Sequence, residues 1–334
     1  MRTAVIGAGS WGTALAIVLA DAGHEVGIWA REEDIASSIN LSRINPTYLK
    51  SIRLPDQISA YTSMEECCRG AKLVIMAPPS HAMRTVAAKM APYLDSDAVV
   101  VSVSKGIELD GFNRMSKVLA EVLDGYITPD QIGVLSGPTH AEEVALRKPA
   151  AIVASSTERQ TAVFIQNSVI TPMLRIYVNS DITGVEIAGS VKNIMAIATG
   201  IIDGAELGDN AAAGLITRSL AEIKRFGITL GAKEETFNGL AGIGDLVVTC
   251  TSRHSRNRYV GYEIGKGKKL SDVIDKMDMV AEGVKTTKSV KEWAQSLNVE
   301  MPITESVYQV LFEDVKPQQA VYELMTREPK EEAC

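Results

Sequence analysis

The sequence predicts an α/β fold in which a doubly wound, mostly parallel sheet domain is followed by an all-α domain. Two patterns support this prediction. In the first half, short β-branched runs alternate with helical stretches, which is typical of a parallel sheet with helices on both faces. After about residue 179, long helical periods replace this alternation. We therefore expect a sheet domain over residues 1–180 and a helical domain over residues 181–334.

The strands of the first half are expected to be buried on both faces, because several of them are continuous apolar runs. They are Thr3–Ile6, Val26–Trp29, Leu73–Met76, Val99–Val103, Ile132–Leu135 and Ala151–Ala154. The helices expected between them are Thr13–Ala22, His81–Met90 and Met115–Leu123.

In the second half, apolar residues recur at intervals of four and three positions from Ile187 to Ile201, which predicts a long helix. Further helices are expected at Asn210–Phe226, Thr286–Leu297, Ile303–Glu313 and Gln318–Met325. No Ser/Pro-rich linker separates the halves. We therefore expect one helix to pack on both halves, with the functional site in the cleft between them.

The composition excludes several classes of function. The chain has 34 basic and 41 acidic residues, a net charge of -7, which argues against nucleic acid as a partner held by bulk attraction. Four cysteines without a Cys-x-x-Cys pair fit a reducing cytoplasm, and the four histidines lack the spacing of metal ligands. The uncharged run Thr3–Ala20 is interrupted by glycines, so we expect no membrane insertion.

The segment Gly7-Ala8-Gly9-Ser10-Trp11-Gly12 follows the first expected strand and opens the first expected helix. In this context, the glycines allow a tight turn and a close approach of the backbone to a pyrophosphate, while the helix offers free N–H groups. We interpret the segment as a dinucleotide-binding loop.

The end of the second strand indicates which dinucleotide is bound. An Asp or Glu there would favour NAD(H), whereas this chain has Arg31, whose guanidinium suits a 2′-phosphate. Glu32 and Glu33 could instead accept a bare ribose hydroxyl, and Arg31 could simply pack over the adenine. We expect NADP(H) to be the favoured cofactor, with NAD(H) possible.

Ligands of open α/β sheets bind beyond the carboxyl ends of the strands. Lys105 lies in such a loop, where a lone cation suits an anionic or carbonyl substrate. Thr139 lies in another loop, and its spacing to Glu142 matches a capping box. Thr139 therefore either caps a helix or contacts a ligand.

Lys192 lies inside an otherwise apolar helix, so its ammonium either extends to the surface or lines a cavity. Partial burial would lower its pKa and allow proton exchange near neutrality. A glycine-rich stretch leads to Asp245, which could orient Lys192. The turn Ser255-Arg256-Asn257 is interpreted as a phosphate site, with a solvated basic turn or a nucleic-acid patch as alternatives.

Motifs extend along nearly the whole chain. They are the glycine-rich segment above, Ser104-Lys105-Gly106-Ile107-Glu108, Ser136-Gly137-Pro138-Thr139, Val191-Lys192-Asn193, Leu207-Gly208-Asp209-Asn210, Gly242-Ile243-Gly244-Asp245-Leu246, Ser255-Arg256-Asn257 and Val280-Ala281-Glu282-Gly283. In order and spacing, they resemble the bacterial-type NAD(P)-dependent glycerol-3-phosphate dehydrogenases. The resemblance implies reversible hydride transfer between NAD(P)H and dihydroxyacetone phosphate, giving sn-glycerol 3-phosphate for phospholipid synthesis in a cytoplasmic homodimer.

The resemblance also implies roles for individual residues. Lys192 would be the proton donor and acceptor, and Asp245 and Lys105 would hold the local charge geometry. The implied substrate-binding residues are Lys105, Gly137, Thr139, Lys192, Asp245, Ser255, Arg256 and Asn257. The cofactor-binding residues, with the loop glycines included, are Gly7, Gly9, Ser10, Trp11, Gly12, Arg31, Lys105, Ala141, Arg256, Val280 and Glu282. The alternatives are another hydroxyacid-type NADP-dependent dehydrogenase of similar architecture, or a redox-sensing module without turnover.

Overall fold

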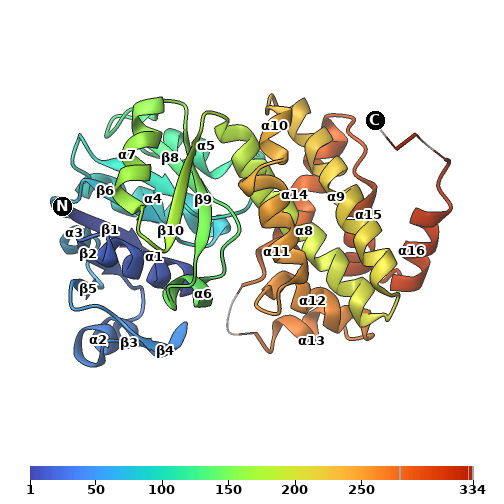
Figure 1. The fold of residues 1–334 in the computed structure, drawn as a ribbon, viewed down its shortest axis with the longest axis horizontal. Coiled ribbons are helices and arrows are strands. Elements are labelled where there is room, and N and C mark those ends of the chain that lie inside the picture. Colours follow the sequence, from blue (N-terminus) through green and yellow to red (C-terminus); the bar gives the residue numbers. More distant parts are fainter. Residues whose placement is uncertain (278–279, 330, 333–334) are drawn as a thin grey trace.

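The computed structural model describes residues 1–277, 280–329 and 331–332, and it consists of a sheet half and a helical half that lie side by side (Figure 1). The last strand ends at Asn179 and the first long helix begins at Ile182. The change from strands to helices therefore falls where the sequence pattern changes. The exact domain boundary between residues 180 and 181 stays a prediction.

The main sheet of the described chain has the strand order β10-β9-β8-β7-β6-β1-β2-β5. Its strands are β1 (Arg2–Ile6), β2 (Glu25–Trp29), β5 (Ile58–Tyr61), β6 (Leu73–Met76), β7 (Val99–Ser102), β8 (Ile132–Ser136), β9 (Ala150–Ser156) and β10 (Leu174–Asn179). All of its pairings are parallel except that of β8 with β9. The short strands β3 (Ile44–Asn45) and β4 (Leu49–Arg53) form a separate antiparallel pair. The predicted mostly parallel sheet is confirmed.

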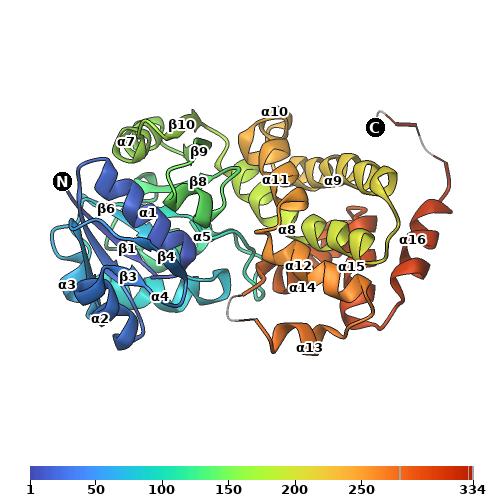
Figure 2. The same ribbon diagram turned by 60° about the horizontal axis from the view of Figure 1, so that its bottom comes forward.

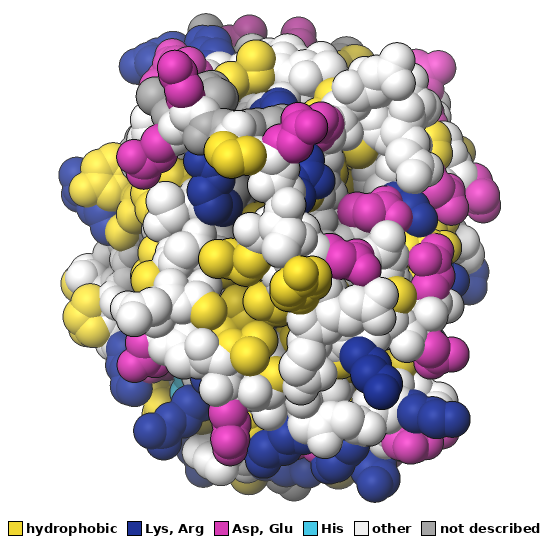
Figure 3. All heavy atoms as spheres, turned by 90° about the vertical axis from the view of Figure 1, so that its right-hand side faces the viewer, with side chains coloured by type: hydrophobic (Ala, Val, Ile, Leu, Met, Phe, Trp, Pro, Cys, Tyr) yellow, Lys and Arg dark blue, Asp and Glu magenta, His cyan; other side chains and the backbone are white. Residues whose placement is uncertain are grey.

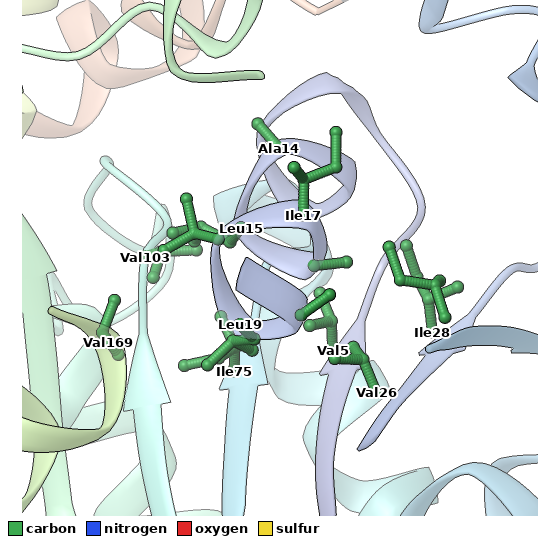
Figure 4. Close-up of a cluster of buried hydrophobic side chains, with 14 of the residues drawn as sticks. Val5, Ala14, Leu15, Ile17, Leu19, Val26, Ile28, Ile75, Val103 and Val169 are labelled. Atoms are coloured by element: carbon green, nitrogen blue, oxygen red, sulfur yellow. The ribbon is translucent and has the colours of Figure 1, made fainter. Parts of the chain in front are cut away.

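Helices cover both faces of this sheet. They are α1 (Ser10–Asp21), α2 (Glu33–Ser42), α3 (Met64–Cys68), α4 (Met83–Met90), α5 (Met115–Val122), α6 (Ala141–Ala145) and α7 (Arg159–Val169). Figure 4 shows Leu15, Ile17 and Leu19 of α1 packed among side chains from β1, β2 and β6. Helix α1 is apolar around most of its circumference because it packs against α6 and α7 as well as against the sheet. The apolar run Thr3–Ala20 is thus a core strand and a core helix.

The second half is helical throughout its described residues. Its helices are α8 (Ile182–Gly204), α9 (Asp209–Thr229), α10 (Glu234–Phe237), α11 (Asp245–Thr251), α12 (Arg256–Gly265), α13 (Leu270–Ile274), α14 (Glu282–Ser296), α15 (Pro302–Phe312) and α16 (Pro317–Met325). Figure 2 shows them gathered beside the sheet half, and Figure 3 shows charged side chains of both signs around a central hydrophobic group on the outer end of this bundle. The predicted all-α second part is confirmed.

Helix α8 is the centre of the helical half and also reaches the sheet. It packs against α9, α11, α12 and α14, and it contacts β8 and β9. Among the described residues it is the one helix whose length and composition would allow it to span a membrane, and its most apolar 18-residue segment is completely buried within the protein. Core packing accounts for this apolarity, and α8 is the predicted helix that packs on both halves.

Candidate active site

A cleft of about 540 Å³ lies between the two halves. The sheet half contributes the turn Gly7–Gly12, Arg31, Lys105 and the segment Thr139–Glu142, and the helical half contributes Lys192, Asn193, Thr249, the segment His254–Asn257, Val280 and Glu282. This volume falls within the range of about 300–1,000 Å³ that is typical of small-molecule sites. The cleft lies where the sequence places the site, between the two halves.

The glycine-rich turn connects β1 to α1 and forms one wall of the cleft. Gly7 has a φ of 118°, and a Cβ there would lie 2.9 Å from the carbonyl oxygen of Ala77. A Cβ on Gly12 would lie 2.0 Å from the carbonyl oxygen of Gly7. At Gly9 a Cβ would meet no protein atom within 4 Å, because this residue faces open space, and no side chain caps the start of α1 there. The turn can therefore receive an anion at Gly9.

Asn45 of β3 holds this turn in place, which the sequence did not reveal. Its buried amide nitrogen donates hydrogen bonds to the carbonyl oxygen of Ala8 (2.8 Å) and to the hydroxyl of Thr13 (2.9 Å). Ser10 donates a further bond to the carbonyl of Tyr48 at 3.0 Å. Residues in and next to the small β3–β4 pair thus fix the geometry of the glycine-rich turn.

Arg31 lies just after β2 at the end of the cleft, as expected. Its side chain is 81% exposed, and its Nε donates to Oε1 of Glu32 at 2.9 Å. The guanidinium is thus available to an anion, but it already has an acidic neighbour in the same cleft.

Lys192 is buried on α8, with its ammonium at the floor of the cleft. Nζ donates hydrogen bonds to Oδ1 of Asp245 and, at 2.6 Å, to Oγ1 of Thr249. An ammonium has three donors, so one is left for a ligand oxygen. Of the two predicted alternatives for Lys192, the structure shows the one in which it lines a cavity.

Burial lowers the pKa of Lys192 to about 7. The charge of Asp245 acts in the opposite direction and raises this pKa, whereas the positive charge of Lys105 lowers it. Desolvation disfavours the charged form of any amine, and it is the largest effect at this position. Lys192 can therefore gain and lose a proton near neutral pH.

Asp245 joins the two lysines. Its side chain is fully buried, and Oδ2 accepts a hydrogen bond of 2.7 Å from Nζ of Lys105. Lys105 also donates to the carbonyl oxygen of Gly137 at 3.2 Å. Gly137 and Asp245 do not themselves line the cleft. Gly137 contacts Lys105, and Asp245 contacts both Lys105 and Lys192.

A distorted turn at Leu240–Gly244 places Asp245 at the start of α11. Gly242 has a non-helical conformation, with φ -92° and ψ -105°. A Cβ on Gly242 would lie 2.0 Å from the carbonyl oxygen of Phe237, so a larger residue does not fit. This contact explains why residue 242 is a glycine.

The Ser255–Asn257 turn opens α12 on the helical side of the cleft. Ser255 caps the helix by accepting a hydrogen bond of 3.2 Å from the N–H of Arg258, and Oδ1 of Asn257 accepts one of 2.9 Å from the N–H of Gly283. The exposed Arg256 lines the cleft. Arg258 instead forms an ion pair with Asp203, so only part of the basic stretch faces the cleft.

The capping interpretation of Thr139 is wrong. Helix α6 begins at Ala141, its N-cap is His140, and no side chain caps it. Thr139 instead donates its hydroxyl hydrogen to the carbonyl of Gly137 at 3.1 Å. The hydroxyl is thus bonded within its own loop, one residue before the N-cap position, and Thr139 lines the cleft.

Glu282 links the two halves at the cleft. Its carboxylate accepts hydrogen bonds from the N–H (3.2 Å) and the hydroxyl (2.5 Å) of Ser80, which follows β6. The neighbouring Val280 is 40% exposed and lines the cleft. Apart from Gly137 and Asp245, every residue predicted for the site lines this cleft. Sequence reasoning did not assign Asn193, Thr249 or the pair His140 and His254, which also line it.

Comparisons with known proteins agree with the resemblance found in the motifs. A family described as NAD-dependent glycerol-3-phosphate dehydrogenase N-terminus matches residues 2–162, and its C-terminal counterpart matches residues 181–322. The chain is 51% identical over 332 residues to a glycerol-3-phosphate dehydrogenase [NAD(P)+] from Chlorobium phaeobacteroides, covering 99% of both chains. It is 50% identical to one from Salinibacter ruber, covering 98% of this chain and 95% of the other.

Solved structures give the same result. The fold matches a glycerol-3-phosphate dehydrogenase from Coxiella burnetii with a TM-score of 0.93 and 40% identity, covering 98% of this chain and 99% of that chain. The enzyme from Saccharomyces cerevisiae matches with a TM-score of 0.83 and 26% identity, over 98% and 99% of the two chains. The resemblance stated from the sequence is confirmed: the chain belongs to the NAD-dependent glycerol-3-phosphate dehydrogenase family.

Proposed function

We propose that the chain catalyses the reversible reduction of dihydroxyacetone phosphate to sn-glycerol 3-phosphate with NAD(P)H. The observation that carries this proposal is a single cleft that contains the glycine turn, the buried Lys192 and the exposed Arg256. The relatives described above carry the same activity in their names.

The glycine turn fits a dinucleotide. The open space at Gly9 and the uncapped start of α1 suit a pyrophosphate, which helix N-termini favour. Ser10, Trp11, Ala141, Val280 and Glu282 would contact the rest of the cofactor from both walls. When bound, the nicotinamide supplies or accepts the hydride.

Lys192 moves the proton. During reduction, negative charge develops on the carbonyl oxygen of the substrate, and Nζ of Lys192 donates a proton to it. Asp245 and Thr249 hold Nζ in a fixed position, so the ammonium needs little reorganisation during the reaction. In the oxidation of the alcohol, the neutral amine of Lys192 accepts the proton.

Cations at the two sides of the cleft hold the anionic substrate. Arg256 would bind the phosphate through charge-assisted hydrogen bonds, with Ser255 and Asn257 shaping the turn around it. Lys105 and Thr139 would contact the three-carbon unit from the sheet side. Binding the phosphate away from the reacting carbon provides energy for positioning that carbon.

We further propose that NADP(H) is favoured over NAD(H), because Arg31 stands where the 2′-phosphate would lie. Arg31 already donates a hydrogen bond to Glu32, and this contact should reduce the preference for NADP(H) over NAD(H). A cytoplasmic homodimer that supplies glycerol phosphate for phospholipids is the expected setting.

The test is to mix the purified chain with dihydroxyacetone phosphate and either NADPH or NADH, and to follow the nicotinamide absorbance. Oxidation of the cofactor that depends on dihydroxyacetone phosphate supports the proposal. Turnover with 2-ketoacids but not with dihydroxyacetone phosphate would favour another hydroxyacid-type dehydrogenase. Binding of NADPH without turnover on any of these ketones would favour a sensor.

A further inference from the structure

Residues 107–114 form a short hairpin of the sheet half that packs into the helical half. The hairpin follows β7 and precedes α5, and an antiparallel bridge between Ile107 and Arg114 closes it. Within it, the N–H of Glu108 donates a hydrogen bond of 3.0 Å to the carbonyl oxygen of Asn113. The structure describes all eight residues, and none of them lines the cleft. The proposed reaction therefore does not use the 107–114 hairpin directly.

Two apolar side chains fix this hairpin in the helical half. Ile107 is 4% exposed and belongs to the buried core of the helices. Phe112 packs against the same core, and its ring stacks on Trp293 of α14, with the centroids 6.1 Å apart and the planes inclined by 7°. Ser289 of the same helix donates a hydrogen bond of 3.4 Å to the carbonyl oxygen of Ile107. The hairpin is therefore packed as a part of the helical half, although the chain on both sides of it belongs to the sheet half.

Phe112 has a backbone conformation that bulky residues rarely adopt. Its φ is 54°, in the left-handed region. Such a conformation costs free energy and persists only where the surrounding contacts impose it, which is common near functional sites. The stack of the Phe112 ring on Trp293 is a contact of this kind. The chain thus keeps a strained residue at the point where the hairpin meets the helical core.

The hairpin is also bound to the sheet half, and Lys105 lies directly before it. Arg84 of α4 donates hydrogen bonds of 2.7 and 3.0 Å to the carboxylate of Glu108. Lys105 is two residues before Ile107. With only one residue between them, a displacement of Ile107 also displaces the backbone of Lys105. The position of Lys105 therefore depends on both halves of the protein.

Lys105 has to reach across the boundary between the halves. Its side chain is 18% exposed, and Nζ donates a hydrogen bond of 2.7 Å to Oδ2 of Asp245 on α11. The charge of Lys105 also acts on Lys192 and lowers its pKa, whereas the charge of Asp245 raises it. The location of the Lys105 ammonium thus affects both the cleft and the group that we assign to proton transfer.

We propose that Phe112 is a positioning residue: through the 107–114 hairpin, its packing on the helical core holds Lys105 against Asp245. Phe112 itself contacts no substrate. The inference rests on the proposed function, in which Lys105 contacts the three-carbon unit of the substrate.

Loss of the Phe112 ring should have two consequences. The substrate loses a cationic contact when Lys105 moves away. At the same time, Lys192 loses a positive neighbour, no longer shares Asp245 with Lys105 and becomes more accessible to water. Each of these changes favours the charged form of Lys192, so its pKa should rise.

The experiment compares Phe112→Asn and Phe112→Tyr with the unchanged full chain. Asparagine tolerates the left-handed region, so Phe112→Asn removes the ring without adding backbone strain, and Phe112→Tyr keeps the ring. Phe312→Asn is the matched control, because Phe312 is also half-buried and packed on the helical core, at the end of α15, with Tyr308 as its aromatic partner. The measurements are KM for dihydroxyacetone phosphate, the pH midpoint of kcat/KM in reduction, and the melting temperature.

Phe112→Asn should raise KM about tenfold, as expected for a lost hydrogen bond to a charged group, and should move the midpoint to higher pH. Phe112→Tyr should keep both values. Phe312→Asn should lower the melting temperature but leave KM and the midpoint unchanged, because a merely structural role does not move the pKa of Lys192. If Phe112→Asn does not fold, Phe112→Leu gives the same test, since it removes the stack on Trp293 and stays apolar.

Three results would overturn the proposal. Unchanged KM and midpoint in Phe112→Asn would show that Lys105 keeps its place without this contact. Equal changes in Phe312→Asn would assign them to a general loosening of the helical core. Equal changes in Phe112→Tyr would show that the ring is not their cause.

If the unchanged chain does not reduce dihydroxyacetone phosphate, the proposed function fails, and the hairpin is tested without turnover. Labelling with acetic anhydride over a range of pH, followed by mass spectrometry of the peptides, gives the pKa of Lys192 in each variant. A higher pKa in Phe112→Asn than in the unchanged chain and in Phe312→Asn supports the role of the hairpin. An equal or lower pKa overturns it.

Discussion

The ammonium of Lys192 on α8 donates a hydrogen bond to the buried carboxylate of Asp245 on α11, 53 residues later in the chain. The other oxygen of this carboxylate accepts a bond from Lys105. One buried negative charge is therefore shared between two positive groups. Burial lowers the pKa of Lys192, and the charge of Asp245 raises it. The balance of these two effects sets the pH at which Lys192 exchanges a proton.

The pH dependence follows from the pKa of Lys192 near 7. Reduction requires the protonated amine, so kcat/KM for dihydroxyacetone phosphate should fall as the pH rises through about 7. Oxidation requires the neutral amine, so kcat/KM for glycerol 3-phosphate should fall as the pH drops through the same value. Steady-state rates between pH 5 and 10 in both directions provide the measurement. Profiles that bend in the same sense in both directions would contradict the role of Lys192.

Replacing the proton donor tests the same role directly. Lys192→Ala should lower kcat by about 10²–10⁴-fold, the usual contribution of a general acid or base. NADPH affinity should stay the same, because we assign the cofactor to the glycine turn on the sheet half. Stopped-flow measurement of hydride transfer, together with fluorescence titration of NADPH, separates the two effects. A variant with normal turnover would remove Lys192 from the mechanism.

Asp245→Asn removes the negative charge and keeps the size of the side chain. Since this charge raises the pKa of Lys192, its loss should lower that pKa further. The midpoint for reduction should then move to lower pH, and activity at pH 7 should fall more in reduction than in oxidation. The check is the pair of pH profiles of the variant, with its melting temperature as the control for folding. A midpoint that does not move would show that Asp245 acts through shape alone.

The strands that the sequence predicted are those covered on both faces, such as β6, where all four residues are buried. The edge strand β10 was missed because it alternates between buried and exposed residues, from Leu174 to Tyr177, in a short segment before a long helix. Helices α10 to α13 were missed because most of them are too short to show a helical period. The direction of β9 could not be predicted, because an apolar run does not reveal whether its neighbour is parallel.

Site residues could be predicted where their residue type is unusual for the sequence segment in which they lie. Lys192 is conspicuous in an apolar helix, and the turn at Gly7–Gly12 stands between a strand and a helix, the context that a dinucleotide-binding loop requires. Asn45, by contrast, is an ordinary polar residue, and only the folded chain shows that it holds Ala8. The contact of His140 with His254 is similarly tertiary, because the two residues lie on loops from different halves.

Two alanine substitutions in the glycine turn should have different effects. Gly12→Ala places a Cβ 2.0 Å from the carbonyl oxygen of Gly7 and should destabilise the fold by roughly 1–3 kcal/mol. A Cβ at residue 9 meets no atom within 4 Å, and Gly9 has a φ of -70°, which alanine adopts without strain. The melting temperature of Gly9→Ala should therefore equal that of the unchanged protein. The new methyl group would nevertheless obstruct the pyrophosphate, and NADPH affinity should fall. Gly9→Ala with normal affinity would show that the dinucleotide does not approach this turn.

The choice of cofactor depends on the balance between Arg31 and Glu32. Arg31→Asp should shift the ratio of kcat/KM for NADPH to that for NADH toward NADH, because a carboxylate repels the 2′-phosphate and accepts a ribose hydroxyl. Glu32→Gln should shift the ratio the other way, since it frees the guanidinium from its acidic neighbour. Both side chains lie at the surface, so neither change should disturb the core. The two ratios are measured from initial rates with each cofactor at low and high salt, because screening should weaken both shifts. If Arg31→Asp leaves this ratio unchanged while Glu32→Gln alters it, Glu32 and not Arg31 determines which dinucleotide is preferred.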